Sequence, residues 1–205
     1  MPTLDPHRYN PLVVEATATS QVLLPLGSKA VVFYTTLATH ELRVRAHGSD
    51  SIFTVLTDAK HAHGFIYNGV AHIYVATLAG TVKLVRYRFF GDPAPTVQDV
   101  EVGYRTIYLH AITQYDWFFL TFSDGGKLFL MAAKDPAFLQ QPRRFRLYTN
   151  SLDPAHYVEN PVLGIHPDDF RLKPAKTRMT VGVERLTIAT GLREVGYFVF
   201  EIELD

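Results

Sequence analysis

Two imidazoles stand one residue apart at His61-Ala62-His63. On an extended chain, alternate residues lie on the same face, so both rings point the same way. Neutral imidazole is a common ligand of zinc and other divalent metals, and such a site needs a third ligand and usually a fourth. No further ligand follows at a motif spacing. His61 and His63 are therefore metal candidates, but a polar loop between strands is the favoured interpretation, and no cofactor is expected.

A second polar cluster, His166-Pro167-Asp168-Asp169, places an imidazole beside two carboxylates. Oxygen-rich loops bind calcium, and paired carboxylates perform acid–base chemistry. Adjacent side chains on an extended chain point apart, which argues against a working pair. A solvated turn is the favoured interpretation. A hydrolase that uses His166, Asp168 and Asp169 is the third of three functional hypotheses.

Other catalytic chemistry finds no support in the residue types. The chain has no cysteine, which excludes a disulfide framework, thiolate catalysis and cysteine-ligated metal sites. It also lacks a nucleophile elbow, a phosphate-binding loop, a dinucleotide fingerprint and a His-Glu-x-x-His helix. We therefore expect that the protein is not an enzyme.

Tyrosines near turns are the candidate binding residues, because tyrosine offers a large contact area at low entropic cost. Near a turn or in the irregular stretch, a rim of the molecule can offer them to a ligand or partner, and two residues of the second polar cluster complete the set. The candidate set is Tyr34, Tyr67, Tyr115, Tyr157, His166 and Asp168. Aromatic residues at strand centres, such as Trp117 and Phe119, are instead expected to pack between sheets.

The charge balance limits the partners. The 205 residues carry 20 basic and 20 acidic side chains, so no net field attracts nucleic acid, and none is expected as a partner. The first residues, 1–11, resemble neither a signal peptide nor a transit peptide. The most apolar stretch, Trp117–Phe122, is too short to span a bilayer. These features predict a soluble protein without membrane insertion, either cytoplasmic or part of a virion or another large assembly.

A repeat of about 44 residues organises the chain. Residues 71–84 align without a gap with residues 115–128, so that Thr77 matches Thr121 and Lys83 matches Lys127. Each unit divides into four short extended runs, separated by turns such as Asn68-Gly69 and Asp124-Gly125-Gly126. The predicted runs of the three regular units are Val22–Leu26, Ala30–Leu37, Glu41–Ala46, Ser51–Leu56; Gly64–Tyr67, Ala71–Leu78, Val82–Phe89, Thr96–Val102; Thr106–Ile112, Asp116–Phe122, Lys127–Ala132 and Arg143–Tyr148.

Four strands in each unit of 40–45 residues are typical of a β-propeller blade. A fourth unit contains a hairpin, Arg185–Thr190 with Val195–Glu203, and lacks an outer strand. Its innermost strand is supplied by either Pro161–Ile165 or Met179–Val183. The alternating run Leu12–Thr17 belongs to no unit. We therefore predict an all-β, single-domain protein over residues 1–205: a small four-bladed propeller closed by its N-terminal strand. Residues 149–178 are predicted to be an irregular insertion, and a β-sandwich or barrel is the alternative fold.

In length and blade number the chain resembles the haemopexin-type four-bladed propeller, although none of that family's motifs matches in register. The resemblance implies a protein-binding or scaffolding role and carries no residue across. The leading hypothesis is accordingly a non-enzymatic interaction module, a structural subunit of a virion or multiprotein complex with other protein subunits as homo- or hetero-oligomeric partners. A carbohydrate- or receptor-binding domain with a glycan ligand is the alternative.

Overall fold

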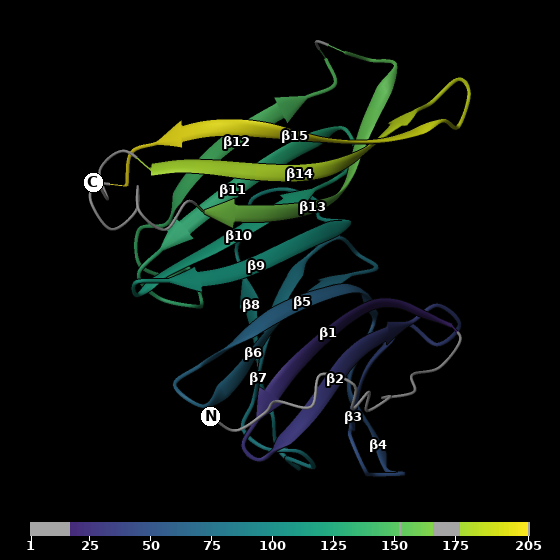
Figure 1. The fold of residues 1–205 in the computed structure, drawn as a ribbon, viewed down its shortest axis with the longest axis vertical. Coiled ribbons are helices and arrows are strands. Elements are labelled where there is room, and N and C mark those ends of the chain that lie inside the picture. Colours follow the sequence, from purple (N-terminus) through teal and green to yellow (C-terminus); the bar gives the residue numbers. More distant parts are fainter. Residues whose placement is uncertain (1–16, 152, 166–176, 205) are drawn as a thin grey trace, which may run out of the picture.

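A computed structural model describes residues 17–151, 153–165 and 177–204. They form an all-β fold of four small antiparallel sheets, arranged as a four-bladed β-propeller (Figure 1). The chain completes each sheet before it starts the next, so that every blade is a meander. Within this described part of the chain, no helix is long and apolar enough to cross a bilayer.

The first two blades each contain four strands. Six of these eight strands begin and end within about two residues of the predicted runs, whereas the innermost strand of each blade begins four or five residues earlier than predicted. The strands of the first blade are β1 (Ala18–Leu26), β2 (Lys29–Thr36), β3 (Glu41–Ala46) and β4 (Ile52–Thr57). Those of the second blade are β5 (Ala59–Tyr67), β6 (Val70–Thr77), β7 (Val82–Tyr87) and β8 (Thr96–Val100).

The third blade repeats this plan, whereas the described residues contribute three strands to the fourth. The third consists of β9 (Tyr108–Gln114), β10 (Trp117–Ser123), β11 (Lys127–Ala133) and β12 (Arg143–Thr149). The fourth consists of β13 (His156–Ile165), β14 (Thr177–Thr187) and β15 (Arg193–Ile202), in the spatial order β13-β14-β15.

Turn chemistry explains why the hairpins form where they do. Asn68 and Gly69 both have positive φ, at 49° and 75°, as the tight β5–β6 turn requires. The equivalent β9–β10 turn uses Tyr115 and Asp116 at φ 49° and 61°, without a glycine. The tyrosine side chain is thereby carried out to the tip of the hairpin.

Neighbouring blades pack face to face through three apolar clusters. One cluster joins blades one and two around Phe33, Ile73 and Val85. A second joins blades two and three around Leu84 and Phe118. The third joins blades three and four and is centred on the side chains of Phe119, Leu130, Met179 and Val181. Among the described residues, no such cluster joins blade four to blade one.

The propeller is confirmed over the sandwich, because four separate sheets succeed one another rather than two sheets packing together. Residues 149–178 were predicted to be irregular apart from Pro161–Ile165, one of two candidates for the innermost strand of the fourth blade. That strand is β13, which begins earlier, at His156, and pairs with β14. The predicted closing strand, Leu12–Thr17, lies outside the described residues except for Thr17, whose carbonyl accepts a hydrogen bond from the Leu37 N–H.

Candidate functional site

The innermost strands of all four blades surround a small cavity at the centre of the propeller. Its volume is about 290 Å³. Lining residues come from β1, β5, β9 and β13: Ser20, Gln21, His61, Ala62, His63, Leu109, His110, Asn160, Pro161 and Val162. The alternation of β5 places both of its histidines on one face, as their spacing predicted, and this face lines the cavity. His110 of β9 joins them, with its ring centroid 3.9 Å from that of His63.

Polar side chains at the axis link one blade to the next. Ser20 Oγ on β1 accepts a hydrogen bond from the Ala62 N–H of β5, at 3.0 Å. His110 Nδ1 on β9 accepts one from the Leu163 N–H of β13, at 3.3 Å. An innermost strand exposes backbone N–H groups that its own sheet does not pair, and a side-chain acceptor on the neighbouring blade satisfies them.

The two histidines of β5 make the same kind of link to β9. His61 Nδ1 accepts from the Leu109 N–H at 3.5 Å. His63 Nδ1 lies 3.3 Å from the Ala111 nitrogen and 3.1 Å from the Ala111 carbonyl oxygen. A ring whose Nδ1 accepts a hydrogen bond is neutral and carries its proton on Nε2. The contacts of His61 therefore require the uncharged imidazole.

The electrostatics of the cavity agree with neutral rings. Burial lowers the pKa of His61 to about 4, and the neighbouring His63 lowers it further by repulsion. Burial also lowers the pKa of His110 to about 3, again with repulsion from the other two rings. For His63, burial lowers the pKa and the hydrogen bond with Ala111 partly opposes that shift. All three rings are uncharged at neutral pH.

This arrangement bears directly on the two metal candidates. His61 and His63 lie side by side on a strand rather than in a loop, and their Nδ1 atoms engage backbone atoms of β9. Among the residues that the structure describes, no group of three or more histidine or carboxylate side chains is placed to hold a metal ion. These contacts connect the second blade to the third.

The predicted binding tyrosines do not form one surface. Tyr34 is fully buried in β2, and Tyr67 packs its ring against Phe118 at 4.8 Å. Tyr115 is 55 % exposed in the β9–β10 turn, whereas Tyr157 is 40 % exposed near the β10–β11 turn, at the other end of blade three. The remaining candidates, His166 and Asp168, lie outside the described residues.

The most exposed apolar surface lies on blade four. Val195, Tyr197 and Val199 of β15 are 87 %, 73 % and 60 % exposed and share one face of the sheet. Val162 of β13 is exposed on the same face. The opposite face of β15, with Phe198 and its neighbours, packs toward blade three. Contiguous exposed apolar surface of this kind marks interaction sites.

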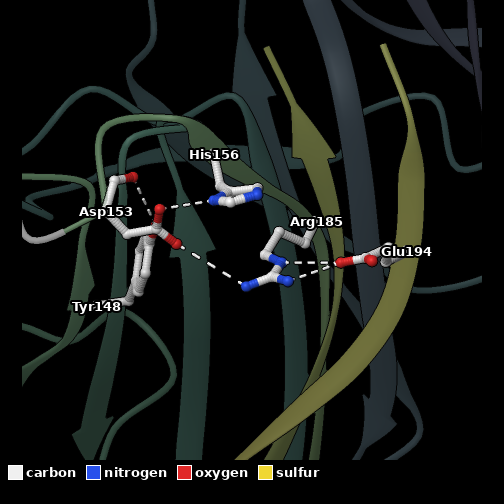
Figure 2. A network of polar contacts seen from close by, with 5 residues as sticks. All are labelled: Tyr148, Asp153, His156, Arg185 and Glu194. Carbon is white, nitrogen blue, oxygen red and sulfur yellow. Dashed lines mark hydrogen bonds and ion pairs between the residues drawn. The ribbon is translucent and has the colours of Figure 1, made fainter. Parts of the chain in front are cut away.

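Ion pairs hold the β14–β15 hairpin in place (Figure 2). Arg185 of β14 donates two hydrogen bonds to Glu194 of β15, at 3.1 and 2.7 Å. The same guanidinium lies 3.8 Å from the Asp153 carboxylate, which also contacts His156 at 2.6 Å. Tyr148 of β12 approaches the Asp153 carbonyl oxygen. The network therefore ties the hairpin to the turn that precedes β13.

A second set of ion pairs secures the other face of the hairpin. Arg193 of β15 pairs with Glu159 of β13 and with Glu184 of β14. Ion pairs therefore hold the N-terminal end of β15 on both faces of the sheet. Sequence reasoning missed this surface, although the run Val195–Ile202, apolar on both faces, was a usable signal.

Comparison with known proteins shows likeness in fold only. No known sequence family matches the chain, and no curated protein matches it in sequence. Two solved structures resemble it at 10 % identity: a subtype N11 neuraminidase-like protein of A/flat-faced bat/Peru/033/2010, with a TM-score of 0.51, and a subtype N10 neuraminidase-like protein of A/little yellow-shouldered bat/Guatemala/060/2010, with a TM-score of 0.50. The matches cover 90 % and 89 % of this chain but 54 % and 58 % of those chains. The chain thus shares the propeller fold of these proteins and spans little more than half their length.

Proposed function

We propose that this propeller is a non-enzymatic interaction module that works as a subunit of a larger protein assembly. One observation carries the proposal: the braced outer strand of blade four displays Val195, Tyr197 and Val199 to solvent. Apolar side chains at this exposure gain free energy when a partner covers them, at about 25 cal/mol per Å². The histidines at the axis are engaged in joining blades, and the exposed tyrosines lie apart.

A photo-reactive amino acid at position 195, compared with the same group at position 37, tests the proposal in the native host. Val195 and Leu37 are both exposed, but Leu37 lies in a turn of blade one. We expect irradiation to link position 195 to another protein chain, with mass spectrometry locating the bond on β15. Position 37 should give no such product. Equal labelling at both positions, or none at position 195, would overturn the proposal.

A further inference from the structure

The outer side of β15 is an unusually regular free edge. Its pairing with β14 runs through ten residue pairs without a bulge. Of the residues that the structure describes, none pairs with its other side. Backbone N–H and C=O groups along such an edge are a template for another strand, and proteins normally protect them with bulges, short strands or charge.

The outer strands of the other blades carry that protection. The pairing of β3 with β4 is interrupted by a bulge at Leu42/Arg43, and the pairing of β11 with β12 by one at Leu128/Phe129. Strand β8 is only five residues long. On β12, Arg143, Arg144 and Arg146 add charge. Blade four alone among these presents a long, unbulged edge with an apolar stripe, so this edge is suited to receive a strand.

The exposed side chains of β15 follow a symmetric order about Tyr197, except that the two terminal side chains have opposite charges. Val195 and Val199 flank Tyr197 symmetrically, and Arg193 and Glu201 flank the valines. If two such strands pair antiparallel about Tyr197, each valine meets a valine and Tyr197 meets its own copy. Each Arg193 then lies opposite a Glu201 of the other copy, so that opposite charges meet at both ends of the paired strands.

We infer that the partner of this edge is a second copy of the chain, paired antiparallel through β15 with a two-fold axis at Tyr197. The inference rests on the proposed function and places the second copy at the edge of the same strand, where the valine and tyrosine side chains of the two copies lie side by side and cover one another in part. The two fourth blades then form one continuous six-stranded sheet. A two-fold contact requires a self-complementary surface. Both the charge order and the apolar order of β15 satisfy this requirement about the same residue.

Single cysteines test the axis, because the chain has no cysteine of its own. Tyr197→Cys places two thiols at directly opposite positions, where a disulfide or a short bis-maleimide joins them. Val195→Cys is the matched control, because the two copies of position 195 would lie about 13 Å apart along the strands. We expect a covalent dimer from the first variant and almost none from the second. Linking at 195 but not at 197 would overturn this geometry.

Charge reversal tests the pairing without relying on any one variant. Arg193→Glu and Glu201→Arg should each weaken self-association at least about tenfold, because like charges then meet at both ends. An equimolar mixture of the two should recover dimers, since each reversed charge then meets its opposite. Recovery does not depend on the contacts of Arg193 within its own blade. Two folded variants that remain monomeric when mixed would overturn the inference.

The photo-linked product at position 195 separates this inference from the proposed function. A product of twice the chain mass supports both. A bond to a different protein leaves the proposed function intact and overturns the second copy as partner. A bond to residues 1–16 of the same chain overturns both, because the chain's own N-terminal part would then occupy the edge. Wild-type protein that stays monomeric up to millimolar concentration also overturns the inference.

Discussion

At the scale of single residues, local sequence determines which way the histidines at the axis point, whereas a distant strand determines what they contact. The His61-Ala62-His63 spacing is sufficient to place both rings on one face, as observed. Their role depends on which strand lies opposite, and β9 begins more than forty residues later. His110 could not be assigned to the same cavity from sequence for that reason. The Nδ1 atoms of His61 and His110 accept hydrogen bonds from backbone N–H groups of the next blade, and these partners cannot be read from the sequence around either histidine.

Stability should fall in mild acid because of these rings. His110 has a folded pKa of about 3, against about 6.5 in an unfolded chain. Its stabilising effect is complete above pH 6.5 and is lost progressively as pH falls toward 3, since the unfolded chain binds the proton first. By pH 5 the loss from this one ring is about 2 kcal/mol, and a protonated Nδ1 can no longer accept the Leu163 N–H.

The variant His110→Asn checks this assignment. Asparagine can present an amide oxygen close to the position of Nδ1 and does not titrate. We expect the free energy of unfolding, measured in urea at pH 7 and pH 5, to drop by about 2 kcal/mol less in the variant than in the wild type. If the two proteins lose the same stability over this range, the ring does not have the depressed pKa that its burial imposes.

At the scale of elements, turn chemistry and alternation predicted most strands to within a few residues, as β3 shows without error. Two departures have physical reasons. The run that became β13 contains proline, asparagine and histidine, which suggested a loop; tertiary pairing with β14 overrides that local preference. The run of β15 is apolar on both faces, which is typical of a central strand, yet it lies at the edge of its sheet among the residues that the structure describes.

The close approach of β5 and β6 leaves no room for a side chain at Gly64. A Cβ at Gly64 of β5 would lie 2.2 Å from the His72 carbonyl oxygen of β6, and both atoms belong to paired backbones. We expect Gly64→Ala to lower the free energy of unfolding by about 1–3 kcal/mol or more. Gly164→Ala on β13 is the matched control, because its Cβ would meet only the Thr180 oxygen, at 3.8 Å. Urea unfolding measures both; equal effects would contradict the close approach.

At the scale of the whole molecule, the described part of the propeller is a series of four blades joined by three apolar interfaces. Blades two and three are covered on both faces, as the nearly continuous burial of β6 and β10 shows. The described residues cover blade four on one face only, and β14 alternates between buried and more exposed side chains. Sequence alone could count the blades, but not say which of their faces remain uncovered, because each face depends on a neighbour distant in the chain.

This asymmetry predicts where the molecule opens first. Local unfolding requires less free energy where fewer apolar contacts are lost, so blade four should open before the central blades. The measurement is amide hydrogen exchange in Val195→Lys, a variant chosen because its charge at an exposed position prevents association from masking the edge. We expect amides of β14 to exchange at least about tenfold faster than those of β6 and β10. Uniform protection across the three strands would instead mean that the fourth blade is held as firmly as the centre, and that its uncovered face costs the fold nothing.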